Sequence, residues 1–298
     1  MLCKNFLDIA SLLLLAAPSA YAARSSGCGA GQGLSSGVQV LTINGVERQY
    51  TLTVPDDYDT NNPYRLIIGM HWWGGTMTDV ATGQTVEEGV WAYYGQEQLA
   101  EGTAIFVAPQ GIDNNWYNEG GSDFMLVDEM ISTVESALCV DTDLRFAIGF
   151  SWGGAMSFAL SCRETEYPLR AITSIAGAGP YECSPGTSSI GYLGIHGISD
   201  DPDRGRTMRD LYITNNGCTG EEQPAPSAGS LTHVKTEYQC SGPPVTWITF
   251  DGGHQPAPYD GGTGDNGSET FVSGEAWAFF SQFQSNSGNS TLGRRRAY

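Results

Sequence analysis

Basic residues are scarce in this 298-residue chain: lysine and arginine together number 14, against 33 aspartate and glutamate residues. The formal net charge of −19 excludes a nucleic-acid partner, because phosphate binding requires clustered lysine and arginine side chains. The same charge argues against binding to an anionic membrane surface. The composition therefore predicts an acidic, soluble protein, and the 40% hydrophobic fraction is enough for a sizeable core.

Long apolar runs are also absent. A membrane span takes about 20 apolar residues, and no stretch of the sequence reaches that length. The main apolar segment covers residues 9–17, after the positively charged Lys4 and before Ala20-Tyr21-Ala22. A positive residue, a short apolar segment and a small-x-small tripeptide are the parts of a secretory signal peptide. We predict a signal peptide over residues 1–22, cleaved near Ala22, and a secreted, extracellular protein with no membrane anchor.

The sequence has no C-x-x-C and no paired-histidine spacing, so it predicts no metal site. Of its seven cysteines, Cys3 falls in the signal peptide, which leaves six. An even number in an oxidising compartment predicts three disulfides, among 15 possible pairings. Cys139 and Cys162 are both expected at the same end of the sheet, which favours their pairing. Cys218 and Cys240 bracket a segment rich in Pro, Ser and Gly that a bond between them would close, which leaves Cys28–Cys183.

Strand-like and helical patterns alternate along most of the chain. Strands are expected at 38–43, 48–54, 65–71, 104–109, 146–149, 170–176, 190–196 and 245–250, and helices at 90–99, 123–138, after 151, and at 274–283. Asn44-Gly45 predicts a hairpin between the first two strands. This alternation predicts an α/β fold with a mostly parallel central sheet, helices on both faces and antiparallel N-terminal edge strands.

No linker or internal repeat divides the chain, so a single domain is expected over residues 23–284. The segment 285–298, rich in Asn, Ser and Gly, is expected to be a disordered tail. Asn266 and Asn289 each begin an N-x-S/T glycosylation sequon.

The stretch 146–156 contains the pattern G-x-S-x-G, with Ser151 between Gly149 and Gly153. An apolar strand precedes it and a helical pattern follows it at once, which is the context of the nucleophile elbow of α/β-hydrolases. Such a turn strains the serine backbone and leaves no room for a Cβ two residues before or after the serine. We predict that Ser151 is a catalytic nucleophile.

A serine nucleophile needs a histidine base and an orienting carboxylate, which in this fold follow in the order Ser, acid, His. His254 follows the final strand at the carboxyl edge of the sheet, the same edge as Ser151, and is our predicted base. His233 lies in a polar excursion and is expected at the surface. His196 ends a strand, where we expect it to shape the acid loop through a hydrogen bond.

Asp200 follows the strand at 190–196, at the same edge, and is the predicted acid. Asp201 precedes a proline, which pushes it toward an extended conformation less suited to reaching the histidine. The remaining rivals are Asp123, Asp128 and Asp251; for Asp123 an N-cap role and for Asp251 a turn-capping role are the simpler explanations.

Two backbone N–H groups are expected to form an oxyanion hole. One belongs to Trp152, at the start of the helix after the elbow. The other comes from the loop after the strand at 65–71, where we nominate Trp73 and keep Trp72 as the second choice. Of these two tryptophans, one ring is expected in the core and the other in the acyl pocket.

Four runs carry a resemblance to a known family: residues 69–75, 149–154, 196–200 and 251–254. They resemble secreted fungal feruloyl esterases of carbohydrate esterase family 1, which also includes acetylxylan esterases and polyhydroxybutyrate depolymerases. The resemblance covers nearly the whole mature chain and implies an α/β-hydrolase fold, no cofactor, and release of ferulic or p-coumaric acid from arabinoxylan or pectin. Its His-Gly-x-x-Asp pattern supports Asp200 over Asp201, although residues 201–204 are more polar than expected of relatives.

Aromatic residues near the elbow could form a flat slot for a hydroxycinnamoyl ring, and core packing explains some of them equally well. The candidates are Trp72, Trp116 and Tyr117.

The same triad would serve an acetylxylan esterase or a polyhydroxyalkanoate depolymerase. A non-catalytic wall-binding protein is disfavoured, because Ser151, Asp200 and His254 are all present. The expected partners are plant cell-wall polysaccharide esters, and the protein is expected to be a monomer.

Overall fold

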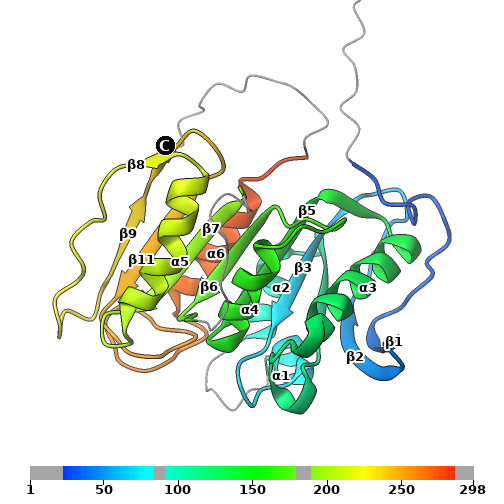
Figure 1. Cartoon of the computed structure of the whole chain (residues 1–298), viewed down its shortest axis with the longest axis horizontal. Helices are drawn as coiled ribbons and strands as arrows, with labels where there is room; N and C mark the ends of the chain where they lie inside the picture. The colour runs from blue at the N-terminus through cyan, green and yellow to red at the C-terminus, as the bar shows by residue number, and fades with distance from the viewer. Residues whose placement is uncertain (1–22, 84–90, 179–188, 286–298) are drawn as a thin grey trace, which may run out of the picture.

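The computed structural model describes residues 23–83, 91–178 and 189–285 (Figure 1). The described strands form a nine-stranded sheet in the order β1-β2-β4-β3-β5-β6-β7-β11-β9, and a two-stranded sheet of β8 and β10. Their bounds are β1 Gly37–Ile43, β2 Val46–Thr53, β3 Tyr64–Met70, β4 Ala104–Pro109, β5 Val140–Phe150, β6 Ala171–Ile175, β7 Gly191–Gly197, β8 Cys218–Thr219, β9 His233–Glu237, β10 Gln239–Cys240 and β11 Val245–Phe250.

The centre of the large sheet is parallel, from β4 through β3, β5, β6 and β7 to β11. The N-terminal hairpin β1–β2 is antiparallel and joins the sheet through an antiparallel pairing of β2 with β4. Asn44 and Gly45 both have positive φ, of 51° and 80°, as a two-residue hairpin turn requires. The predicted mostly parallel sheet with antiparallel N-terminal edge strands is confirmed.

Helices cover both faces of this sheet (Figure 1). The helices are α1 Met77–Thr82, α2 Gln96–Ala100, α3 Ser122–Ala137, α4 Trp152–Ser161, α5 Pro202–Asn215 and α6 Phe271–Ser281. Apolar side chains of α3, α4 and α5 join one buried cluster, and those of α1, α2 and α6 join another. The apolar strands of the sheet supply both clusters, because successive residues of a strand point to opposite faces.

Several elements of the second half were not expected from the sequence, among them β9, α5 and the short strands β8 and β10. Strand β9 lies in the polar excursion between Cys218 and Cys240, and pairs antiparallel with β11 at the edge of the sheet. Most of its side chains are half-buried or exposed, so its residues carry no apolar run. Helix α5 is likewise polar overall. The helix expected at 90–99 is in fact a short 3₁₀ turn, Ala92–Gly95, followed by α2.

The disulfide prediction is correct for one pair and wrong for the other two. Cys218 is bonded to Cys240, as expected. Cys139, however, is bonded to Cys28 and not to Cys162. Cys162 is also disulfide-bonded, and Cys183 lies outside the described residues.

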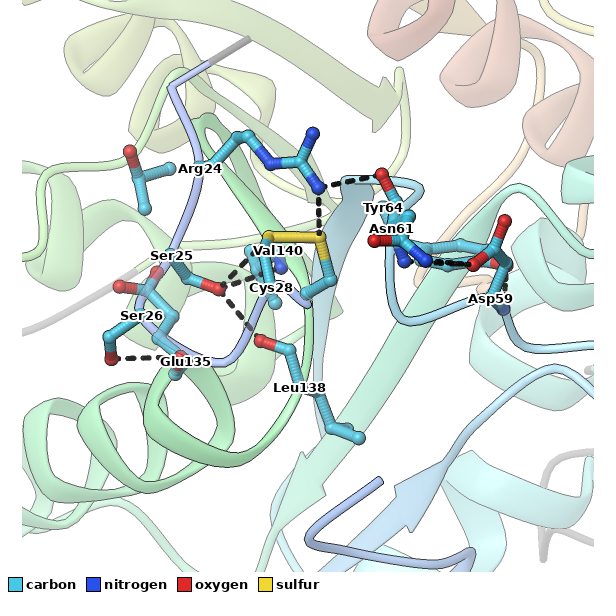
Figure 2. Close-up of a disulfide and its surroundings, with 12 residues drawn as sticks. Arg24, Ser25, Ser26, Cys28, Asp59, Asn61, Tyr64, Glu135, Leu138 and Val140 are labelled. Carbon is cyan, nitrogen blue, oxygen red and sulfur yellow. Dashed lines mark hydrogen bonds between the residues drawn. A yellow bond between two sulfur atoms is a disulfide. The ribbon is translucent and has the colours of Figure 1, made fainter. Parts of the chain in front are cut away.

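The N-terminal segment is hydrogen-bonded to the residues on either side of Cys139, Leu138 and Val140 (Figure 2). The Ser25 hydroxyl donates to the carbonyl oxygen of Leu138 at 2.7 Å and accepts from the N–H of Val140 at 2.9 Å. These two bonds bracket Cys139 and bring the chain that carries Cys28 against it. Cys139 lies at the start of β5, as expected, but the entry segment with Cys28 reaches the same place, which was not expected.

The predicted boundaries of the domain can be followed only in part. The predicted signal peptide and residues 286–298 of the predicted tail, with Asn289, lie outside the described residues. Ser285, the first residue of that tail, packs on the domain, where its hydroxyl donates to Asp141 at 3.0 Å. Asn266 lies half-buried in the loop between β11 and α6. In the described part of the chain, no helix has the length and apolar character to cross a membrane.

Candidate active site

Ser151 occupies the sharp turn between β5 and α4. Its backbone has φ 56° and ψ −120°, a strained conformation for a residue with a side chain. A Cβ added to Gly149 would collide with the backbone of Gly153, and one added to Gly153 would collide with the carbonyl oxygen of Met70. The two glycines of the motif are therefore required by close packing, as predicted. The N–H of Ser151 donates to the carbonyl oxygen of Ile175 on β6 at 2.9 Å, which fixes the turn.

Three side chains that lie far apart in the sequence meet at this turn. Nε2 of His254 lies 2.8 Å from Oγ of Ser151, and Nδ1 lies 2.7 Å from Oδ2 of Asp200. A carboxylate only accepts hydrogen bonds, so Nδ1 carries the proton and Nε2 is left to accept from the serine hydroxyl. The structure thus brings together the three residues that the sequence analysis selected, in the arrangement in which a serine can be activated.

Further side chains contact both the acid, Asp200, and the base, His254. Nε2 of the fully buried His196 lies 2.8 Å from the carbonyl oxygen of Asp200, the contact expected for a histidine that shapes the acid loop. Burial lowers the pKa of His196, which favours its neutral form. The ring of Phe250, the last residue of β11, packs 4.6 Å from the ring of His254. Only part of the His254 side chain is covered, with 47% of it exposed at the surface.

The rival carboxylates have other partners, away from His254. Asp123 pairs with Arg48 at 2.7 Å, Asp128 pairs with Arg163 at 2.6 Å, and Asp251 accepts from the N–H of Leu231 at 2.8 Å. His233 is likewise apart from the triad, since its Nδ1 contacts the carboxylate of Asp260 at 2.9 Å.

Asp201 is outside the triad, but the reason given from the sequence was wrong. Its backbone is left-handed, with φ 50° and ψ 62°, and not extended. It precedes Pro202 at the start of α5, and its exposed side chain pairs with Arg204 at 3.1 Å. The turn into α5 therefore directs the carboxylate of Asp201 to the surface, while Asp200 faces the histidine.

The tryptophans divide into buried and exposed ones. Trp116 is completely buried, and its indole N–H donates to the carbonyl oxygen of His71 at 2.7 Å. Trp72 is 3% exposed and packs near Phe150 in the core. Both rings are therefore occupied by packing inside the domain, which argues against the predicted contact of Trp72 and Trp116 with substrate.

The loops after β3 and β4 each carry an exposed aromatic side chain. Trp73 is 66% exposed and Tyr117 is 58% exposed. The Tyr117 ring meets that of Trp152, the residue after Ser151, in an edge-on contact with centroids 6.2 Å apart. The loops that carry them are joined, since the N–H of Gly74 donates to the carbonyl oxygen of Asn114 at 2.8 Å. Tyr117 thus remains a candidate for substrate contact.

The predicted oxyanion donors are compatible with the structure. Among the residues described, the N–H groups of Trp152 and Trp73 donate to no acceptor. The N–H of Trp72, the second choice, also donates to no acceptor in the described part of the chain, so hydrogen bonding alone does not decide between the two tryptophans.

Comparison with known proteins gives the family. "Probable feruloyl esterase C" of Aspergillus terreus is 45% identical over 239 residues, which cover 79% of this chain and 85% of that protein. Feruloyl esterase D of Neurospora crassa is 41% identical over 282 residues, covering 91% of this chain and 95% of that protein. The chain belongs to the fungal feruloyl esterase family. Feruloyl esterase C of Emericella nidulans is 40% identical over 264 residues, covering 87% of this chain and 92% of that protein.

Structural comparison agrees at the level of the fold. A solved ferulic acid esterase superposes with a TM-score of 0.52 at 15% identity, covering 75% of this chain and 93% of that chain. No family model matches the sequence. As a member of the feruloyl esterase family, the chain is a carboxylic ester hydrolase with an α/β-hydrolase fold.

Proposed function

We propose that this chain is a secreted serine esterase that releases ferulic or p-coumaric acid from plant cell-wall polysaccharide, acting as a monomer. The observation that carries the proposal is the pair of His254 contacts, 2.8 Å to Ser151 and 2.7 Å to Asp200. The hydroxycinnamoyl substrate rests on the relatives, which are named feruloyl esterases. Secretion is supported by the predicted signal peptide and by the disulfides, which form in oxidising compartments.

In the first half of the reaction, Oγ of Ser151 attacks the ester carbonyl carbon while Nε2 of His254 takes the hydroxyl proton. Asp200 keeps the proton of the imidazole on Nδ1 and stabilises the imidazolium that forms. The carbonyl oxygen becomes an oxyanion, which the N–H groups of Trp152 and Trp73 bind. Each such donor contributes on the order of 3 kcal/mol to the transition state in enzymes of this kind.

The tetrahedral intermediate then collapses. The bond between the carbonyl carbon and the sugar oxygen breaks, and the sugar alcohol leaves with the proton from His254. In the second half, His254 takes a proton from water, and the resulting hydroxide attacks the acyl-enzyme. Ser151 recovers its proton as the free acid departs, so the enzyme returns to its starting state.

The test compares wild type and Ser151→Ala on methyl ferulate, with circular dichroism to verify folding. The variant should be inactive and folded; retained hydrolysis would rule out Ser151 as the nucleophile. Rates on methyl ferulate and on acetylated xylan then decide the acyl preference. A higher kcat/KM on acetylated xylan would replace the proposed substrate with that of an acetylxylan esterase.

A further inference from the structure

His71 lies directly after β3, and its side chain is fully buried next to the loop that carries Trp72 and Trp73. Its Nδ1 lies 2.8 Å from the carbonyl oxygen of Trp72, and its Nε2 lies 3.0 Å from the N–H of Gly111. The carbonyl can only accept and the amide can only donate, so Nδ1 carries the proton and Nε2 does not. Both ring nitrogens are therefore engaged by backbone groups of two different loops.

The contact with Trp72 fixes the orientation of one peptide group. The same carbonyl oxygen also accepts from the N–H of Gly75 at 3.0 Å, so two donors hold it on the inner side of the loop. In a trans peptide the C=O of one residue and the N–H of the next point in opposite directions. The peptide between Trp72 and Trp73 therefore turns the N–H of Trp73 away from the buried ring of His71.

Further bonds join the end of β3 to the loop after β4. The carbonyl oxygen of His71 accepts from the buried indole of Trp116, whose ring packs 4.4 Å from the imidazole. A Cβ added to Gly111 would collide with the carbonyl of Asn115 and crowd Nε2 of His71. The imidazole is thus enclosed on several sides. Burial lowers its pKa to about 4, which keeps it neutral and preserves both hydrogen bonds over most of the pH range.

We propose that His71 is a positioning residue that holds the Trp72–Trp73 peptide so that the N–H of Trp73, and not that of Trp72, serves as the second oxyanion donor. This inference rests on the proposed serine esterase function. It applies to any ester that Ser151 attacks, because the oxyanion forms on the carbonyl whatever the acyl group is. No sequence pattern indicates this role, because His71 is only the polar residue at the end of a buried strand.

The experiment measures kcat and KM on 4-nitrophenyl acetate for two variants of His71. His71→Leu removes both hydrogen bonds, whereas His71→Asn keeps an N–H at the position of Nδ1 and loses only the acceptor for Gly111. We expect kcat to fall about 100-fold in the Leu variant and less than about tenfold in the Asn variant, with KM changed less than about threefold in both.

Tyr94→Phe is the matched control for lost stability. The Tyr94 hydroxyl is buried and donates to the carbonyl oxygen of Met70 at 2.6 Å, one residue before His71, and in the described part of the chain no hydrogen bond joins it to the Trp72 peptide. This variant should melt at a lower temperature and keep kcat within about twofold. A Leu variant of His71 with kcat near wild type, or an Asn variant as impaired as the Leu variant, would overturn the proposal.

A second measurement needs no variant of His71. An arylboronic acid adds to the serine and mimics the tetrahedral intermediate, so NMR of the ¹⁵N-labelled wild type should show a downfield shift of the Trp73 amide proton on binding. A shift of the Trp72 amide instead, or a His71 ring protonated on Nε2, would contradict the inference. If the wild type hydrolyses no ester, or if Ser151→Ala remains active, the proposed function itself is wrong. If both behave as expected and only the His71 results differ, the role of His71 alone is wrong.

Discussion

The imidazole of His196 lies 2.8 Å from the main-chain carbonyl oxygen of Asp200, while the carboxylate of Asp200 lies 2.7 Å from the imidazole of His254. A carbonyl accepts hydrogen bonds, so Nε2 of His196 is the donor. One histidine therefore holds the main chain of the acid, and the acid holds the second histidine. This arrangement lets a buried, neutral side chain influence catalysis without contacting substrate.

Replacing His196 by Leu should lower kcat about tenfold, because the loop that carries Asp200 loses its hydrogen bond to the core. Leaving a carbonyl unpaired should also reduce the free energy of unfolding by about 1–3 kcal/mol. Steady-state kinetics and urea unfolding measure the two effects. His233→Leu is the matched control, since His233 pairs with Asp260 outside the triad, and its kcat should change less than about twofold.

The neighbouring aspartates Asp200 and Asp201 should differ sharply in their importance. Asp200→Asn removes the acceptor that keeps the His254 proton on Nδ1, and should reduce kcat about 10⁴-fold, as in other serine triads. Asp201→Asn breaks only an exposed ion pair with Arg204, and should leave kcat within about twofold of wild type. A larger loss in Asp201→Asn than in Asp200→Asn would refute the assignment of the acid.

Acid should destabilise the fold through His71. Burial depresses its pKa in the folded state to about 4, while the unfolded chain binds the proton near pH 6.5. The unfolded state therefore binds more protons between these values, and roughly 3 kcal/mol of stability is lost as the pH falls from 6.5 to 4. The lowered pKa of His196 acts in the same direction.

The effect of His71 can be isolated by comparison with His71→Asn, which has no titrating group at this position. The difference in the free energy of unfolding between wild type and the variant should shrink as the pH is lowered from 7 to 4. Chemical unfolding at several pH values measures it. A difference that stays constant with pH would show that His71 does not carry the dependence.

The space around two glycines predicts opposite results for their substitution by alanine. Gly153→Ala places a methyl group against the carbonyl oxygen of Met70, and should prevent folding or abolish activity. Gly274→Ala, on an exposed face of α6, has no atom within 4 Å of the new methyl group. It should raise the free energy of unfolding by about 0.5–1 kcal/mol with kcat unchanged. Thermal unfolding and ester hydrolysis distinguish the two.

The two described disulfides should stabilise the protein unequally. The Cys28–Cys139 bond closes a loop with a sequence separation of 111, against 22 for Cys218–Cys240. Loop-closure entropy predicts that Cys28→Ala with Cys139→Ala costs roughly 1.4 kcal/mol more than Cys218→Ala with Cys240→Ala. Unfolding of both double variants measures the costs. Peptide mapping of the unreduced protein should recover Cys28 linked to Cys139, and recovery of Cys139 linked to Cys162 would contradict the structure.

Local patterns in the sequence determined the elements of the central sheet and the triad. The parallel strands β3, β4, β5, β6, β7 and β11 are mostly apolar because both faces of the sheet are covered, so their residues alone mark them. Gly149, Ser151 and Gly153 specify the elbow because its backbone geometry excludes a Cβ on either side. His254 and Asp200 could be chosen because parallel strands end at one edge of the sheet, and each lies in the loop that follows such a strand, Asp200 after β7 and His254 after β11.

Only the tertiary structure decided several of the contacts between side chains that are distant in the sequence. The partner of Cys139 depended on where the N-terminal segment docks, and that follows from hydrogen bonds of Ser25 and Gly27 to residues near Cys139 and not from any pattern around the cysteines. Trp72, Trp73 and Trp116 are chemically alike in the sequence, yet two of the rings are in the core and one is exposed. Their burial depends on how neighbouring loops pack, as does the role of His71, because a contact between distant residues leaves no periodic signal in either segment.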